Sequence, residues 1–504
     1  MTSLWLDRTD VPTSDPFVPG GEFDDVIVGA GLTGLVSSVL LARAGRRVAV
    51  LEARRLGAVT TGNTTGKLTL LQGTSLSKIV RSHSEKVAAA YVEGNRAGQT
   101  WVLDYCAEYA VPVERRDAWT YAGSPAARSS VRREYEIGRD VGLDLSLEDA
   151  VELPYSTYGA VRLPDQAQLY PVDLLVALAR ELRERNGLLI EGLRVRNISV
   201  NQKATVATDR GNLVADHVVV ASGIPFLDRG LYFAKVTPQR SYALAFRVPG
   251  DRPQGMYISA DKPTRSLRTA MHGAEELLVV GGNGHEGGHF PQSPSRLVED
   301  LVSWTTKQFP GAELTHTWSA QDYQSHNHVP FIGKLPRGGG KVQLATGYGK
   351  WGMTNSAMAA LMITDTILGQ KTEWARTLNT RMTKPSAVLE GVRFNAGVGI
   401  TATKDWVGAE LRPISVQNTK PEEGQGQVGS EHGRPVAIST VDGTTCAVSA
   451  ICTHLGGIIR WNDLERSWDC PLHGSRFASD GTLLEGPGTE NLKRIPVDQR
   501  DSGS

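Results

Sequence analysis

Hydrophobic and polar positions follow different periods along this chain, and their order near the start defines one supersecondary unit. An apolar run over residues 24–28 leads into a glycine-rich turn and then into a helix-like stretch that ends at Gly45. A second apolar run, Arg47-Val-Ala-Val-Leu-Glu52, follows and ends on an acid. This order predicts a strand, a tight turn, a helix and a second strand.

The rest of the chain carries weaker patterns. Residues 73–150 read as mostly helical, and Pro171 to Asn186 predict another helix. Residues 196–223 predict two hairpin strands and a return to the first sheet, whereas 226–328 alternate apolar and polar residues, which predicts an antiparallel sheet. The pattern weakens between Gly369 and Leu411, and residues 418–434 predict a surface loop.

The turn after the first strand reads Gly29-x-Gly31-x-x-Gly34. In this context Gly29 permits the sharp turn, Gly31 lets the backbone approach a pyrophosphate, and Gly34 lets helix and strand pack closely. The helix N-terminus then faces the phosphates, and Glu52 is placed to accept hydrogen bonds from the ribose hydroxyls. The fingerprint predicts a bound dinucleotide, and by itself it leaves FAD and NAD open.

Composition narrows the function classes. The 504 residues hold 54 Lys and Arg against 54 Asp and Glu, so no basic excess favours nucleic acid. No apolar run approaches the roughly 20 residues of a membrane helix, and the N-terminus lacks the pattern of a secretory signal. Only four cysteines occur, too few for a disulfide framework. We expect a cytoplasmic protein without a membrane span.

Downstream blocks distinguish the dinucleotides. A loop rich in small and hydroxyl residues follows Glu52, a strand closes on Ala-Ser-Gly223, and Pro-Phe-Ile-Gly333 precedes Gly347-Tyr-Gly-Lys-Trp-Gly-Met-Thr354 and a helix. With the glycine fingerprint, these blocks resemble the D-amino-acid oxidase and glycine oxidase superfamily of FAD-dependent oxidoreductases over about residues 22–370. The resemblance implies FAD, with the 61–67 loop and the 347–354 block near the flavin ring. The cofactor-binding residues that it implies are Gly29, Ala30, Gly31, Leu32, Thr33, Gly34, Glu52, Ala53, Arg54, Thr61, Gly62, Asn63, Thr64, Thr65, Gly66, Lys67, Ser222, Gly223, Gly333, Gly347, Tyr348, Gly349, Lys350, Trp351, Gly352, Met353 and Thr354.

Two Cys and His pairs stand near the C-terminus. Cys452-x-His454 and Cys470-x-x-His473 offer four metal ligands, and this ligand set alone also suits a structural zinc ion. Each pair gives one Cys and one His, so two cysteines can hold one iron and two histidines the other, as in a Rieske 2Fe-2S centre. The flanking residues Cys-Thr-His-Leu-Gly and Cys-Pro-Leu-His-Gly-Ser resemble the two cluster-binding loops of Rieske proteins, and this resemblance covers about 412–500.

The same resemblance points to two features that affect the cluster potential. High-potential Rieske proteins carry an extra Cys in each loop, joined as a disulfide, and Gly457 and Leu472 occupy those places here. Ser475 matches a serine whose hydroxyl supports a cluster sulfide, which raises the potential. Cys106 and Cys446 are expected to be packing residues.

The expected fold is an α/β FAD-binding domain, Rossmann-like and of the glutathione reductase type, with an antiparallel β substrate domain and a C-terminal all-β Rieske domain. We place the oxidoreductase domain at 1–370, its substrate sheet at about 226–328, a connecting segment at 371–411 and the Rieske domain at 412–500.

Together the two domains predict a flavin dehydrogenase. We expect a small amine or amino acid to give hydride to the flavin, and the electrons to pass singly through the cluster to an external acceptor, either a protein or a quinone-like carrier. The family resemblance suggests clamps on the substrate more than acid-base groups, and Arg240, Tyr257 and Arg268 are candidates, with Lys350 beside the flavin loop. The alternatives are an oxygen-using oxidase, a reductase component fed by a partner, and a redox sensor or scaffold.

Overall fold

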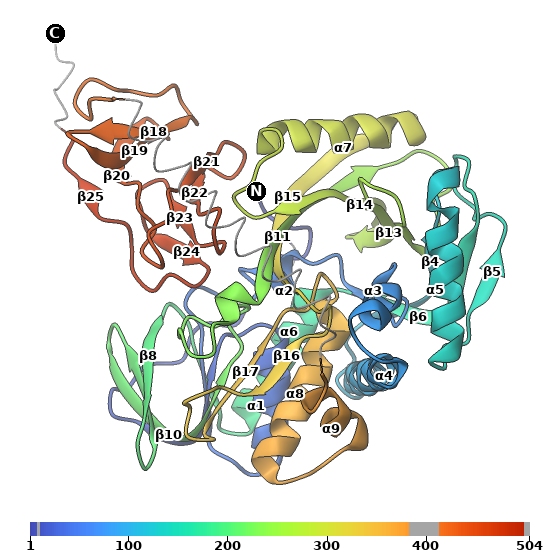
Figure 1. Cartoon of the computed structure of the whole chain (residues 1–504), viewed down its shortest axis with the longest axis horizontal. Helices are drawn as coiled ribbons and strands as arrows, with labels where there is room; N and C mark the ends of the chain where they lie inside the picture. Colours follow the sequence, from blue (N-terminus) through green and yellow to red (C-terminus); the bar gives the residue numbers. More distant parts are fainter. Residues whose placement is uncertain (8–10, 383–412, 498–504) are drawn as a thin grey trace. The chain divides into compact units, whose positions relative to one another are not determined.

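The computed structural model describes residues 1–7, 11–382 and 413–497 (Figure 1). Contacts between Cα atoms divide the chain into two compact units: residues 1–284 with 300–388, and residues 285–299 with 389–504. Most of the expected connecting segment, 371–411, lies outside the described residues. None of the described helices is long and apolar enough to cross a membrane.

The first unit contains a sheet whose core strands are parallel. Its strand order is β16-β17-β10-β1-β2-β7, and β8 and β9 extend it as a hairpin beside β10. β1 pairs in parallel with β2 and β10, and β10 in parallel with β17, whereas β16 runs antiparallel to β17. The strands are β1 (Glu22–Val28), β2 (Val48–Leu51), β7 (Leu188–Ile190), β8 (Val195–Val200), β9 (Ala204–Thr208), β10 (Gly211–Val220), β16 (Phe331–Lys334) and β17 (Val342–Thr346).

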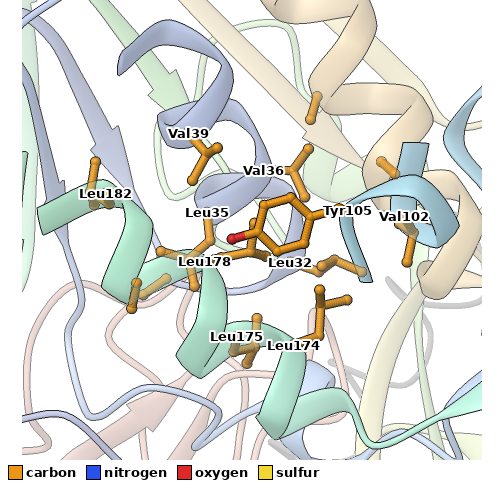
Figure 2. Packing of buried hydrophobic residues seen from close by; sticks show 14 of the residues in the cluster. Leu32, Leu35, Val36, Val39, Val102, Tyr105, Leu174, Leu175, Leu178 and Leu182 are labelled. Carbon is orange, nitrogen blue, oxygen red and sulfur yellow. The ribbon is translucent and has the colours of Figure 1, made fainter. Parts of the chain in front are cut away.

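Four helices of this unit pack through one apolar cluster, and other helices contribute to a second cluster. Figure 2 shows side chains of α1 between those of α6 and α4, and the residues labelled there are Leu32, Leu35, Val36, Val39, Val102, Tyr105, Leu174, Leu175, Leu178 and Leu182. Burial of such side chains is the main stabilising contribution to the fold. The helices of the described residues are α1 (Leu32–Arg43), α2 (Thr60–Asn63), α3 (Ser75–Ser82), α4 (Glu85–Glu108), α5 (Arg128–Asp140), α6 (Pro171–Glu184), α7 (Pro294–Gln308), of which only residues from 300 onward belong to the first unit, α8 (Gly352–Leu368) and α9 (Glu373–Asn379), with short 3₁₀ turns at η1 (Pro125–Ala127) and η2 (Tyr232–Ala234).

A nine-stranded sheet forms the other layer of this unit, in the order β15-β11-β14-β13-β12-β4-β6-β3, with β5 beside β6. It differs from the predicted substrate sheet because four of its strands precede residue 226, and β12 pairs with β4 in parallel. β4 interrupts the stretch predicted as helical, since its charged sequence, Val-Glu-Arg-Arg-Asp-Ala-Trp-Thr-Tyr, hides the strand period. The strands are β3 (Lys67–Leu68), β4 (Val113–Tyr121), β5 (Ser146–Glu148), β6 (Ala160–Leu169), β11 (Val236–Arg247), β12 (Met256–Ser259), β13 (Arg265–His272), β14 (Glu275–Glu286) and β15 (Glu313–Ser325).

The C-terminal unit is built from two antiparallel four-stranded sheets. Its core includes Ile459, Trp468 and Phe477, all fully buried. The predicted surface loop at 418–434 is wrong in its second half, because residues from Gly426 onward pair with β19. The strands are β18 (Gly426–Glu431), β19 (Arg434–Val441), β20 (Thr444–Ser449) and β25 (Arg494–Ile495) in one sheet, and β21 (Arg460–Asn462), β22 (Ser467–Asp469), β23 (Arg476–Ala478) and β24 (Leu483–Glu485) in the other.

Candidate functional site

The turn between β1 and α1 requires glycine for two distinct reasons. Gly29 has a φ of +106°, and a Cβ there would lie 2.6 Å from the carbonyl oxygen of Ala221. A Cβ on Gly34 would overlap the carbonyl oxygen of Gly29. At Gly31 a Cβ would approach only the hydroxyl of Thr61, at 3.3 Å. The turn is thus tightly packed toward the sheet and open at Gly31, which fits a pyrophosphate at the helix N-terminus.

Glu52 lies at the end of β2, next to this turn. Its carboxylate accepts hydrogen bonds from the backbone N–H groups of Ala30, at 3.0 Å, and Arg54, at 2.8 Å. Burial raises the pKa of Glu52, and these two hydrogen bonds oppose that rise. The carboxyl group is therefore fixed beside the glycine turn, where we propose that it receives the adenosine ribose.

Donor side chains hold the loop at 61–67 from outside. Four successive carbonyl groups of the loop each accept a hydrogen bond: Gly62 from Ser3 Oγ (2.6 Å), Asn63 from Trp318 Nε1 (2.9 Å), Thr64 from Trp5 Nε1 (2.6 Å) and Thr65 from Arg268 Nη1 (2.8 Å). Thr61 Oγ1 in turn accepts from the backbone N–H of Leu32, at 3.2 Å. The loop is thereby fixed between α1 and the nine-stranded sheet.

Arg268 is used inside the protein. Besides Thr65, its guanidinium donates to the carbonyl oxygens of Thr269 at 2.9 Å and of Gly66 and Leu169 at 3.2 Å. It is fully buried, and burial lowers its pKa to about 10. These contacts favour a role in positioning the 61–67 loop over the role of a substrate clamp.

Lys67 and Tyr257 also meet within the sheet. Lys67 Nζ donates to the Tyr257 carbonyl oxygen, at 2.8 Å, and to the Ser266 hydroxyl. Burial and the nearby charge of Arg268 lower the pKa of Lys67 well below its usual range. The Tyr257 hydroxyl accepts from the Gly255 N–H at 3.3 Å, and its ring stacks on Trp119. Both side chains are thus engaged with the sheet itself.

The 347–354 block reaches the glycine turn and the sheet. The Tyr348 hydroxyl lies 2.7 Å from Thr33 Oγ1, which joins this block to α1. The Lys350 N–H donates to the Asp322 carboxylate. A Cβ on Gly284 would overlap Lys350 Nζ and lie 3.0 Å from Ser241 Oγ. The ammonium group therefore stands against β11 and β14, and loss of water around it lowers its pKa to about 8.

Of the four candidate catalytic residues, Lys350 and Arg240 both contact β11, but on opposite faces, because Lys350 Nζ lies by Ser241 and successive side chains of a strand alternate. Arg240 is buried on β11, one residue before Ser241, and donates from Nη1 to Ser319 Oγ at 2.8 Å. Three other predicted positions, Ser222, Gly223 and Gly333, lie at strands β10 and β16 of the eight-stranded sheet. Ser222 Oγ donates to the Ile224 carbonyl at 2.8 Å, the Gly223 carbonyl accepts from Thr346 Oγ1 at 2.6 Å, and Gly333 lies in β16.

Sequence reasoning missed a group of side chains beside Lys350. His328 contacts Gln324, with 3.4 Å between His328 Nδ1 and Gln324 Nε2, and Gln324 packs against Gly349. Burial, with the charges of Lys78 and Arg81, lowers the pKa of His328 to about 4. No sequence motif marks His328, because Lys78, Arg81 and Lys350 come near it only in the folded chain.

The two Cys and His pairs converge in the C-terminal unit. Cys452 and Cys470 are buried and free, each thiol shifts the pKa of the other, and the His454 and His473 ring centroids lie 5.1 Å apart. The Cys470 thiol and the backbone N–H groups of His454 and Leu455 lower the pKa of Cys452. The two thiols thus lie together and the two imidazole rings lie together. A 2Fe-2S centre with one iron bound by two cysteines and the other by two histidines requires this arrangement. We propose these four side chains as the cluster ligands.

Close packing surrounds these ligands. A Cβ on Gly457 would lie 2.7 Å from a methyl group of Leu472 and 3.1 Å from Cys470 Sγ. Gly457 and Leu472, the two positions where the resemblance places the disulfide cysteines of high-potential Rieske proteins, therefore lie against each other. The cysteine thiols make no disulfide with each other or with Cys106 and Cys446.

Ser475 is expected to raise the cluster potential. Its hydroxyl oxygen accepts from the Gly488 N–H at 3.0 Å, so its own proton is available to Cys452 Sγ. A hydrogen bond of about 0.5–1.5 kcal/mol that favours the more negative reduced state is equivalent to roughly 20–60 mV. We expect Ser475→Ala to lower the midpoint potential by that amount in a redox titration followed by EPR. Thr453→Ala is the control, since the Thr453 hydroxyl donates to the Glu490 carbonyl instead, and an equal shift in both variants would contradict the assignment.

Two family models match this chain. Residues 24–366 match the FAD dependent oxidoreductase family (DAO), and residues 414–496 match the Rieske [2Fe-2S] domain. The chain therefore belongs to the DAO family of FAD-dependent oxidoreductases and carries a C-terminal Rieske domain. The expected fold class and both expected cofactors, FAD and a 2Fe-2S cluster, are confirmed by these matches.

Individual relatives agree with this assignment. A Bacillus subtilis (strain 168) protein, provisionally named Rieske 2Fe-2S iron-sulfur protein YhfW, is 29% identical over 502 residues, which cover 98% of each chain. Gamma-glutamylputrescine oxidoreductase of Escherichia coli (strain K12) is 23% identical over 69% of this chain and 84% of its own. The crystal structure of glycine oxidase from Geobacillus kaustophilus superposes with a TM-score of 0.59 at 19% identity, covering 70% of this chain and 96% of that one.

Proposed function

We propose that this protein is an FAD-dependent dehydrogenase that oxidises a small amine or amino acid and delivers the electrons, one at a time, to an external acceptor. The observation that carries the proposal is the presence on one chain of a DAO-family domain and a complete set of Rieske ligands, Cys452, His454, Cys470 and His473. FAD supplies acceptance of two electrons as a hydride, and the cluster supplies transfer of single electrons.

The substrate class follows from the relatives and from the charges of the site. The names of two similar proteins, a glycine oxidase and a gamma-glutamylputrescine oxidoreductase, specify an amino acid and an amine. In this chain Lys350 and Lys78 interact electrostatically, and Lys78 also acts on His328. The Lys350 ammonium group, whose charge the buried Asp322 carboxylate partly balances, can attract a substrate carboxylate, which favours an amino acid. Oxidation removes a hydride from the carbon next to nitrogen and a proton from nitrogen, and water hydrolyses the resulting imine to a carbonyl compound and ammonia.

The residues of this chain contribute mainly by binding and orientation. Lys350 stands against β11 and β14, and Arg240 is held by Ser319 on the other face of β11. Arg268 and Trp5 fix the carbonyl groups of the 61–67 loop, so that loop needs little rearrangement when it meets a cofactor. The neutral amine is the reactive form of the substrate. Lys350, with a pKa of about 8, can lose its own positive charge near neutral pH and would then favour that neutral form.

The proposal is tested by mixing the holoenzyme anaerobically with a panel of amines, amino acids and hydroxy acids. We expect one class to bleach the flavin absorbance, and a Rieske-type EPR signal to appear afterwards in the same sample. Ferricyanide or a quinone should then restore both centres. Reduction of both centres only by a protein or nicotinamide donor would instead support the reductase component. Flavin reoxidation by oxygen with a cluster that never becomes reduced would support the oxidase.

A further inference from the structure

Three side chains from distant parts of the first unit converge at a place that includes none of the proposed cofactor-binding residues. Asp7 precedes the first strand, His272 ends β13, and His316 lies in β15. Asp7 Oδ2 is 3.4 Å from His316 Nε2 and 3.9 Å from His272 Nε2, and one ligand atom from each residue lies within 4.8 Å of the others. The two imidazole rings meet edge to face, with centroids 5.1 Å apart.

The hydrogen bonds of Thr315 determine which nitrogen of His316 carries the proton. Thr315 Oγ1 donates its proton to the Ala245 carbonyl oxygen at 3.0 Å, so at 3.0 Å from His316 Nδ1 it acts as an acceptor. His316 Nδ1 therefore carries a hydrogen, and in the neutral ring Nε2 presents a lone pair toward Asp7. A carboxylate oxygen and a nitrogen lone pair that face each other repel, so either a proton on Nε2, which makes a hydrogen bond of 3.4 Å, or a metal ion has to lie between them.

The imidazole of His272 offers a second nitrogen ligand at the same place. His272 Nδ1 is buried and makes no hydrogen bond within the described residues, so the orientation of the ring depends on what lies between Nε2 and Asp7. The Glu275 carboxylate also interacts electrostatically with His272. Two imidazoles and one carboxylate are ligands that zinc and similar divalent transition ions prefer. Two donors that each lie about 2.1 Å from a tetrahedral zinc ion are roughly 3.4 Å apart, which matches the distance between Asp7 and His316.

We propose that Asp7, His272 and His316 form a binding site for a divalent transition-metal ion of the zinc type, with water completing the coordination. The hydrogen bond from His316 Nδ1 to Thr315 Oγ1 leaves Nε2 free to bind the metal ion. Metal-bound histidines usually have such a partner on their other ring nitrogen. The site lies entirely in the first unit and is independent of the proposed dehydrogenase activity.

The ion would fasten the N-terminal segment to the nine-stranded sheet. Asp7 closes a turn with Ser3, since its N–H donates to the Ser3 carbonyl oxygen at 3.1 Å. Between them, Leu4 and Trp5 are buried against the sheet with Ala245, Ala270 and Trp318. Ser3 and Trp5 bind the 61–67 loop through the carbonyl groups of Gly62 and Thr64. Metal binding at Asp7 therefore stabilises the segment that holds the loop.

The test counts zinc on the full-length protein loaded with FAD and cluster, using Zn²⁺ alone as the probe. After equilibrium dialysis, we expect the wild type to bind one Zn²⁺ more per chain than Asp7→Asn and His316→Ala, with iron and flavin contents unchanged. Loss of a direct ligand should weaken binding by at least about 100-fold, the upper range for changes in outer-shell partners. His432→Asn, which removes an exposed imidazole at a turn, serves as the control and should keep the ion.

Thermal unfolding gives a second readout. A ligand at 100 times its Kd raises the ratio of folded to unfolded protein about 100-fold, so Zn²⁺ should raise the unfolding temperature of the wild type and of His432→Asn only. Equal zinc counts in the wild type, Asp7→Asn and His316→Ala would overturn the site. Loss of zinc in His316→Ala with full binding in Asp7→Asn would overturn the attachment of the N-terminal segment. If His316→Ala does not fold, the comparison with Asp7→Asn decides.

Discussion

Cys452→Ser is expected to yield a flavoprotein without its iron–sulfur cluster. The Cys452 thiol is buried, contacts Cys470 and receives backbone N–H groups that favour its thiolate form. A serine hydroxyl in its place is a hard and weakly acidic ligand, whereas iron–sulfur clusters are held by thiolates. Iron and acid-labile sulfide should fall to background while FAD content stays at the wild-type level. The amine substrate should still reduce and bleach the flavin, and reduction of ferricyanide through the cluster should be lost.

Cys446→Ser is the matched control for this change. Cys446 lies in β20, six positions before Cys452, and its half-buried thiol belongs to neither ligand loop. We expect this variant to keep iron, sulfide and the EPR signal. A wild-type cluster in Cys452→Ser would show that the ligand assignment is wrong, and loss of the cluster in both variants would indicate damage to the domain instead.

Gly34→Ala is expected to prevent FAD loading by disrupting the turn between β1 and α1. The added methyl group would overlap the Gly29 carbonyl oxygen, and that atom belongs to backbone that has no room to move, because Gly29 itself packs on Ala221. Overpacking of this kind costs about 1–3 kcal/mol of unfolding free energy, and more where backbone must shift. We expect protein purified from this variant to carry little flavin and to unfold at a lower denaturant concentration than the wild type.

Substitutions at two further glycines distinguish a loss of FAD binding from a loss of fold stability. Gly31→Ala adds a methyl group that meets only the Thr61 hydroxyl, so the fold should persist while FAD affinity falls. Gly45→Ala adds one in open space at a φ of +78°, which costs about 1 kcal/mol in strain and should leave FAD content unchanged. Full flavin loading of Gly34→Ala would contradict the packing argument.

Motifs that depend on local geometry could be predicted from the sequence. The glycine turn and the two ligand pairs each require particular residue types at fixed spacing, because a backbone approach or a metal ion leaves little freedom. The helix predicted from Pro171 is confirmed as α6, since its apolar positions recur with the helical period. The family matches confirm the cofactors that these motifs imply.

Contacts between distant segments could not be predicted in this way. Arg268 looked like a substrate clamp, but a guanidinium binds a backbone carbonyl as readily as a substrate carboxylate, and only the fold brings Thr65 to it. The charged strand β4 could not be predicted, because its sequence shows no clear alternation of apolar and polar residues. Only its pairing with β6 and β12 in the folded chain defines it as a strand. His328 beside Gln324, and Asp7 beside His316, are likewise products of chain topology.

The hydrogen bond between Thr33 and Tyr348 also sets the order of events during biosynthesis. These residues are 315 positions apart in the sequence. At a translation rate of about 5–20 residues per second, roughly 16–60 seconds separate the emergence of the glycine turn from that of its partner. The contact between Thr33 and the 347–354 block is therefore missing for most of the synthesis, and we expect stable capture of flavin to follow release of the segment around residue 354. Cofactor supply and chaperone protection matter most for this protein in that interval.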